Sequence, residues 1–93
     1  MPAAAPTWLA AHLGRVVIAD LDGCYLAIGT LQAADDAAMT LVDADLHDHT
    51  EANCTKDVYA LESRSLGVRV NRQRVTVPLG RVIAIGLLED VAP

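Results

Sequence analysis

Apolar, β-branched runs alternate with short polar segments along most of the chain, which predicts a protein built mainly of β-strands. Five runs have this character, and glycine or polar residues bound each of them. They cover residues 15–21, 25–33, 39–47, 74–78 and 81–89. The Asp22-Gly23 pair between the first two runs is typical of a tight hairpin turn. We therefore expect antiparallel neighbours joined by short connections.

Two segments have the spacing of helices. A short helix is predicted over 7–13, where Thr7 can act as N-cap and Gly14 can end it. A longer helix is predicted over 55–66, where apolar residues recur at helical spacing. The order of helix, three strands, inserted helix and two strands suits a small, partly open barrel.

The third strand has two chemically different sides if its side chains alternate regularly. The apolar side would contain Thr40, Val42, Ala44 and Leu46, and the polar side Asp43, Asp45 and His47. We expect the polar side to be the solvated, acidic end of the strand. In the second strand, Gly29 is expected to mark a sharp bend.

A chain of 93 residues suits one domain. A chain of this size buries only about two-thirds of its unfolded surface, so self-association would add stability. We expect a flexible tail over residues 1–6 and a single domain over 7–93, with an insertion at about 48–73.

The charge is unevenly distributed. The net charge of −5 argues against generic binding to nucleic-acid backbones. Residues 35–62 hold eight acidic residues and one base, whereas residues 64–81 hold five arginines and no acid. The second segment can therefore form a basic patch on an acidic protein.

Features of secreted, membrane or cofactor-binding proteins are absent from the sequence. The two cysteines, Cys24 and Cys54, form no disulfide framework or CxxC pair. The N-terminal residues lack the basic region and long apolar run of a signal peptide. No apolar run approaches the roughly 18 residues that span a bilayer. Without a Gly-rich phosphate loop, no cofactor is expected. We expect a cytoplasmic protein with reduced thiols that does not contact a membrane.

Three short motifs, in this order, resemble the Sm/LSm family. Leu13-Gly14 precedes the first strand, Gly29-Thr30-Leu31 lies in the second, and Asp36-Ala37-Ala38-Met39 leads into the third. Residues 77–85 keep the apolar frame of the second family motif. The chain thus resembles a divergent, bacterial-type member of that family. The resemblance implies an N-terminal helix followed by a five-stranded, strongly bent antiparallel sheet that forms an open barrel. Here the longer helix is inserted between strands three and four.

The resemblance also implies a homo-oligomeric ring of five to seven subunits, in which strand four of one copy pairs with strand five of the next. A physical argument supports it, because a partly open barrel leaves two strand edges unpaired. The segments 75–77 and 82–85 are uncharged edges of this kind. The alternative is a closed monomer with short strand edges. The implied role is non-enzymatic assembly or binding, with RNA as the implied partner.

Family members that bind uridine-rich RNA use a planar side chain before the Met, an Asn after it, and an Arg from the second motif. Here those positions fall on Ala38, Thr40, and either Pro78-Leu79 or Leu79-Gly80. None supplies a π-face, an amide or a guanidinium. The Sm-like scaffold is therefore predicted without the usual uridine site.

Two groups of residues remain as nucleic-acid contacts. The candidates are Asp36, Met39 and Thr40 in the turn, and Arg64, Arg69, Arg72 and Arg74 around the inserted helix. Repeated around a ring, the arginines would form a basic belt for phosphates. The alternative is that they pair with the acids of 43–62.

The segment DADLHDH offers a competing hypothesis. If the strand continues past Leu46, Asp43, Asp45, His47 and His49 project from one face, and such ligands suit zinc, manganese or iron. The alternative function is then a metal-binding protein or a metal-dependent hydrolase. Polar residues at a strand end are more commonly solvated than bound to a metal. We therefore expect this chain not to be an enzyme.

Overall fold

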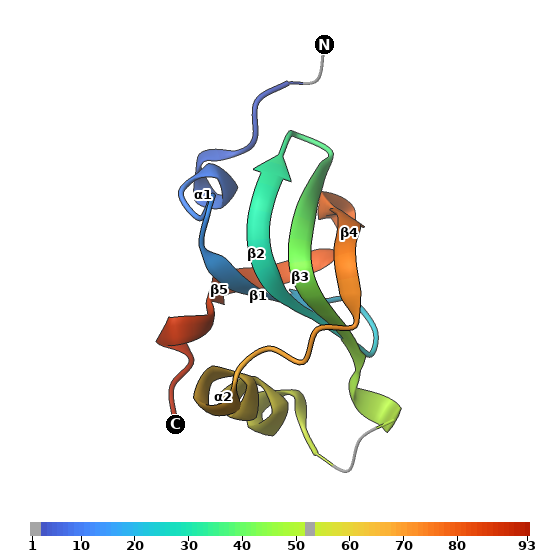
Figure 1. Cartoon of the computed structure of the whole chain (residues 1–93). Helices are drawn as coiled ribbons and strands as arrows, with labels where there is room; N and C mark the ends of the chain where they lie inside the picture. The colour runs from blue at the N-terminus through green and yellow to red at the C-terminus, as the bar shows by residue number, and fades with distance from the viewer. Residues whose placement is uncertain (1–2, 52–53) are drawn as a thin grey trace.

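The computed structural model describes residues 3–51 and 54–93. Its helices and strands are α1 (Thr7–Ala10), β1 (Val16–Leu21), β2 (Tyr25–Ala34), β3 (Ala38–Asp48), α2 (Lys56–Leu66), β4 (Arg72–Pro78) and β5 (Val82–Leu87). Short 3₁₀ turns follow β3 at His49–Glu51, β4 at Leu79–Arg81 and β5 at Leu88–Asp90. The predicted fold class is confirmed: the chain is mainly β, with a short N-terminal helix and a helix between β3 and β4 (Figure 1).

The helix ends differ from the prediction at α1. Thr7 is the first helical residue and Pro6 the N-cap, without a side-chain hydrogen bond, so the predicted cap is wrong. The helix stops at Ala10, and Gly14 ends the following turn with a φ of 81°. In α2 the Thr55 hydroxyl accepts a hydrogen bond from the Val58 amide at 3.2 Å, which caps the helix. None of the described helices is long and apolar enough to cross a membrane.

Part of the predicted tail lies against the sheet. Residues 1–2 are outside the described part of the chain, but Ala4 forms an isolated bridge with Asp35. The Asp36 amide donates to the Ala3 carbonyl at 3.3 Å. Residues 3 and 4 thus contact the turn between β2 and β3. Of the expected insertion at 48–73, residues 52–53 are also outside the described part.

The five strands form one antiparallel sheet in the order β4-β3-β2-β1-β5. The sheet is strongly curved, and β5 crosses behind the other strands in Figure 1. It is not closed, because β4 and β5 are its two edges and do not pair with each other. Consecutive strands are neighbours except at β5, which returns to pair with β1.

A bulge in β3 changes which side chains face inward. Ile28 pairs with Asp45 and Thr30 with Val42, so that Gly29 alone stands opposite two residues of β3. Asp43 is one of those two and has a φ of 47°. An extra residue of this kind bends a strand and increases its twist. The bulge therefore lies where the sequence analysis placed a bend.

The predicted regular alternation of inward-facing and outward-facing side chains along β3 is therefore wrong. Before the bulge, Met39 and Leu41 are buried, whereas Thr40 and Val42 are only half-buried. After the bulge, Ala44 faces the core. The opposite side, where Asp45 follows Ala44, is not solvated either, since Asp45 is 1% exposed.

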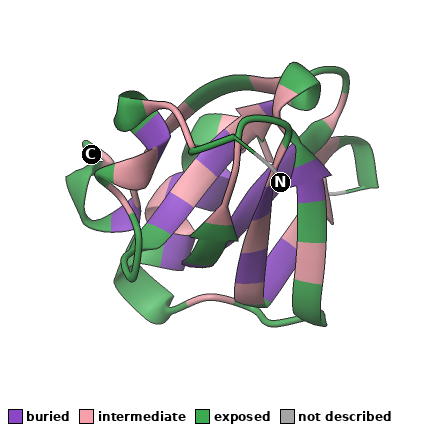
Figure 2. Ribbon diagram, turned by 90° about the horizontal axis from the view of Figure 1, so that it is seen from above, coloured by how far each residue is buried: buried purple, intermediate pink, exposed green. Residues whose placement is uncertain are grey.

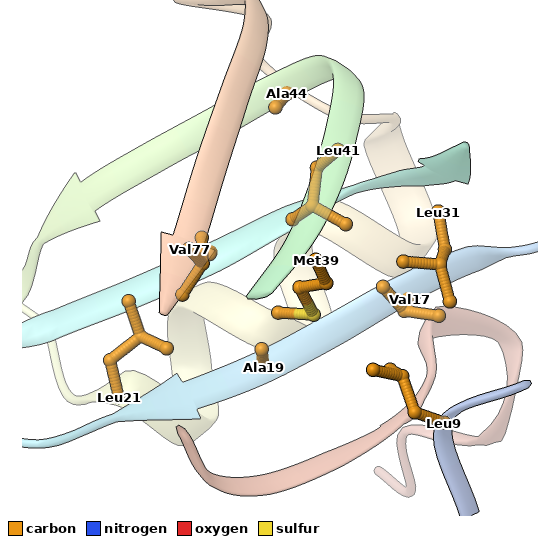
Figure 3. Close-up of a cluster of buried hydrophobic side chains, with 10 residues drawn as sticks. Leu9, Val17, Ala19, Leu21, Leu31, Met39, Leu41, Ala44 and Val77 are labelled. Carbon is orange, nitrogen blue, oxygen red and sulfur yellow. The ribbon is translucent and has the colours of Figure 1, made fainter. Parts of the chain in front are cut away.

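Two apolar clusters occupy opposite sides of the sheet. Along the strands, buried residues are interspersed with more exposed ones (Figure 2). The larger fills the inside of the curve, where Leu9, Val17, Leu31, Met39 and Leu41 point toward one another (Figure 3). The smaller lies on the outer side and consists of Leu26, Ile28, Tyr59 and Leu88. Because Tyr59 belongs to α2, this second cluster holds the inserted helix on the sheet.

The Gly29 site predicts a sharp sensitivity to a single methyl group. A Cβ at Gly29 would lie 3.0 Å from the Ala44 Cβ and 3.1 Å from the Val42 carbonyl oxygen. We expect Gly29→Ala to lower the free energy of unfolding by about 1–3 kcal/mol, because backbone must move to admit it. Urea denaturation measures the change. Gly80→Ala is the control, because nothing lies within 4 Å of a Cβ there. An equal loss in both variants would contradict the argument.

Candidate assembly and nucleic-acid interface

The turn between β2 and β3 lies against the turn between β4 and β5. Ala38 pairs with Pro78, and the Leu79 amide donates to the Ala37 carbonyl at 2.8 Å. The Asp35 carboxylate accepts from the amides of Ala37 and Ala38 at 2.8 and 2.9 Å. These backbone hydrogen bonds lower the pKa of Asp35, so its charged form holds the turn. Asp35 was not among the predicted site residues, although an Asp at a turn is a common capping signal.

The predicted turn contacts differ in their access to a ligand. Asp36 is exposed, Thr40 is half-buried and pairs with Thr76, and Met39 is 1% exposed within the core. Where the two turns adjoin, Ala37, Ala38, Leu79 and Gly80 carry small or aliphatic side chains. They supply neither a ring to stack on a base nor an amide to read its edge.

Arg81 follows these turns and was not predicted as a site residue. Its guanidinium forms an ion pair with the Asp22 carboxylate at 3.0 Å, and its carbonyl accepts from the Asp22 amide at 2.9 Å. This contact joins the start of β5 to the turn between β1 and β2. Arg81 is thus partly engaged by its own subunit.

Three of the four predicted arginines have a partner among the described residues, and each has a different one. Arg64 donates to the Val91 carbonyl, and Arg72 donates to the Asn71 carbonyl at 3.0 Å. Arg69 lies 3.4 Å from a Glu62 carboxylate oxygen and 5.4 Å from the centre of the Tyr59 ring.

The acidic residues of 43–62 therefore neutralise the four predicted arginines only in part. Of the four predicted arginines, Arg69 alone has a carboxylate within ion-pair distance among the described residues. The other three guanidinium groups are exposed without one. Two of them, Arg72 and Arg74, lie on the edge strand β4.

The structure separates the four residues of the predicted metal cluster. The bulge leaves Asp43 exposed, while Asp45 is buried under α2. His47 stacks on the Tyr59 ring with centroids 3.5 Å apart, and the His49 ring nitrogen Nδ1 lies 2.9 Å from the Cys24 carbonyl oxygen. The described residues contain no group of three or more His, Cys, Asp or Glu side chains placed to hold a metal.

A buried polar network takes the place of that cluster. The Tyr59 hydroxyl donates to one oxygen of the Asp45 carboxylate, and the Asn71 amide nitrogen donates to the other at 3.0 Å. Asn71 also accepts from the Leu46 amide at 2.9 Å. Burial, and next the hydrogen bond to Asp45, raise the pKa of Tyr59 to about 12. The network connects α2, β3 and the start of β4, which is a structural role.

The two free edges of the sheet have apolar surroundings. Along β5, Ile83 is 68% exposed, and Trp8 of α1, 50% exposed, lines the same hollow. Beside β4 lies a hollow of about 540 Å³, which Leu21, Val75 and Val77 line in part. Each edge therefore offers unpaired backbone groups next to apolar side chains, the combination that a further strand would cover.

The Asp45 network predicts the behaviour of a Tyr59→Phe variant. The change removes the hydroxyl that donates a hydrogen bond to the buried Asp45 carboxylate. We expect the free energy of unfolding at neutral pH to fall by about 1–3 kcal/mol. The raised pKa of Tyr59 stabilises the fold fully below its ordinary value of 10, and this contribution is lost as pH rises toward about 12.

Urea denaturation from pH 7 to 11.5 measures both effects. The wild type should lose stability across the alkaline range more steeply than Tyr59→Phe. Tyr25→Phe is the matched control, because Tyr25 is 43% exposed. Parallel alkaline slopes for wild type and Tyr59→Phe would contradict the assignment.

Comparison with known proteins identifies the fold. No protein-family model matches the chain, and no curated protein matches it in sequence. Among solved structures, the Sm protein of Pyrococcus abyssii in complex with a uridine heptamer is similar, with a TM-score of 0.60 and 16% sequence identity. The alignment covers 86% of this chain and 92% of that one. At this identity the likeness concerns the fold, and together with the open five-stranded sheet behind a short helix it shows that this chain has the Sm fold.

Proposed function

We propose that this chain is a non-enzymatic assembly and binding protein, copies of which join through β4 and β5. The observation that carries the proposal is the open sheet, whose two edges are uncovered within the subunit. Adding the β4 of one copy to the β5 of the next satisfies the unpaired backbone groups of both.

The composition of the edges supports pairing. Soluble proteins commonly protect an edge strand with lysine, proline or an inward-pointing charge. β5, from Val82 to Leu87, has no charged residue and no proline. β4 carries its charges at its start, at Arg72 and Arg74, and continues as Val75-Thr76-Val77. The two strands have seven and six residues, so they can pair along most of their length.

The geometry of such a joint favours a closed ring. Because the two edges belong to different strands, every contact is head-to-tail, and such contacts close into a ring when the rotation between copies allows it. A ring of five to seven subunits is our proposal for the size, in line with the Sm fold. Burial at the joints would compensate for the small core of a chain this short.

The edge proposal is tested by Ile83→Lys. The side chain at this position is largely exposed, so the lysine should leave the subunit fold intact while placing a charge at the β5 edge. We expect native mass spectrometry to find five to seven chains for the wild type and a single chain for the variant. Leu66→Lys is the matched control, because Leu66 is 77% exposed on α2 and belongs to neither edge strand. Equal assembly of Ile83→Lys and wild type would contradict the joint.

RNA binding is the second candidate function. The similar Sm structure is a complex with a uridine heptamer, and the arginines around α2 and β4 supply positive charge here. The adjoining turns at Ala38 and Leu79 offer no stacking platform. We therefore propose that RNA contacts this chain through its phosphates, at the exposed Arg64 and Arg69 beside α2, and without preference for uridine.

Fluorescence anisotropy with labelled heptamers of uridine and adenosine tests this proposal. We expect similar affinities for the two and a fall of at least tenfold between 50 and 200 mM salt, as expected for phosphate contacts. Arg64→Ala combined with Arg69→Ala should weaken both equally. A strong preference for uridine that Thr40→Ala removes would instead place the contact in the turn.

A further inference from the structure

A groove lies between α2 and the outer side of the sheet, beside the free edge of β5. Its volume is about 710 Å³. The floor comes from β1, β2 and β5, one wall from α2, and the other wall from residues 91–93. Because Ala84, Ile85 and Gly86 belong to the edge strand, a strand that joins β5 would run directly beside this groove.

The floor of the groove nearest the edge is made of small residues. Ala84 and Gly86 alternate with Ile85 and Leu87, which pack into the inner cluster, so the two small residues face outward. A Cβ at Gly86 would have no atom within 4 Å. There is therefore open space above β5 for side chains from a neighbouring strand.

The outer side chains of β4 fit this position. On β4, Val75 and Val77 pack into the inner cluster, which places Arg72 and Arg74 on the outer side. When β4 of one copy joins β5 of another so that the inner clusters are continuous, the arginines lie on the side of Ala84 and Gly86. Both pairs of residues are two apart in a strand, so their spacings match.

The charges are complementary as well. Asp20 and Asp57 are among the residues that line the groove. Asp20 forms an ion pair with Lys56 at 2.6 Å, which leaves Asp57 as the carboxylate without a cation among the described residues. Arg72 and Arg74 are guanidinium groups without a carboxylate in the same part of the chain.

We propose that Arg72 and Arg74 of one copy occupy the groove between α2 and β5 of the next copy. Their aliphatic stems would cover Ala84 and Gly86, and a guanidinium would meet Asp57. This inference rests on the edge-to-edge assembly proposed above and extends it in two ways. It identifies Arg72 and Arg74 as the side chains that select β4 as the strand that pairs with β5 of the next copy. It also makes the inserted helix α2 one wall of the subunit joint.

Filling the groove is the first test. Gly86 has an ordinary φ and open space at its Cβ, so Gly86→Val should fold as the wild type does. The new side chain would occupy the place of the incoming arginines, and we expect the dissociation constant of the assembly to rise at least tenfold in analytical ultracentrifugation. Gly80→Val is the matched control, with equally open space but outside the groove. Thermal unfolding of each variant verifies that the subunit is folded.

Charge reversal is the second test. Arg74→Glu and Asp57→Arg should each weaken assembly, and the two together should restore much of it, since every joint would again bring opposite charges together. Backbone pairing of the edges alone predicts no such recovery.

The outcomes separate this inference from the assembly on which it rests. A monomeric wild type overturns both. A wild type that assembles, with Gly86→Val and Arg74→Glu assembling equally well, overturns the groove contact and leaves edge pairing intact. If Arg72→Ala with Arg74→Ala abolishes binding of an RNA heptamer but not assembly, the arginines belong to a nucleic-acid surface, and the groove contact is again overturned.

Discussion

The close approach of β2 and β3 at Gly29 is the constraint on which the rest of the structure depends. One residue of β2 faces two residues of β3, and the absence of a side chain at Gly29 lets Ala44 approach. The bulge bends the sheet around its inner cluster. It also shifts the alternation of β3, which places Asp45 and His47 under α2. An open, curved sheet with two separate edges is the result.

Much of the fold follows from local sequence signals, whereas the candidate sites depend on distant contacts. The five strands, the inserted helix and the position of the bend could be predicted because apolar runs and Gly29 are visible locally. The burial of Asp45 could not, because its partners Tyr59 and Asn71 lie 14 and 26 residues away. A carboxylate with two donors can be buried, while the same carboxylate without them stays in water.

At the turns, too, the residues that determine the fold differ from the side chains that would contact a ligand. The Gly-x-Leu and Asp-x-x-Met motifs place Leu31 and Met39 in the core. Together with Leu-Gly they predicted the Sm fold, which the solved protein shares at 16% identity. The side chains that would meet a ligand vary independently of that frame. Here Ala38 and Thr40 occupy such positions, while Met39 between them is held in the core. The motif residues of this chain therefore predict its fold, but they do not determine its ligand.

The two clusters on opposite sides of the sheet have a consequence for local unfolding. The inner cluster does not include any residue of α2, and the outer cluster includes one, Tyr59. The helix can therefore detach as a cooperative unit while the curved sheet remains folded. In native-state hydrogen exchange, the amides of α2 would exchange through this partial opening, well before those of β2, which is covered on both sides. The part of the chain that distinguishes it from a minimal barrel is thus also a part that can open separately from the curved sheet.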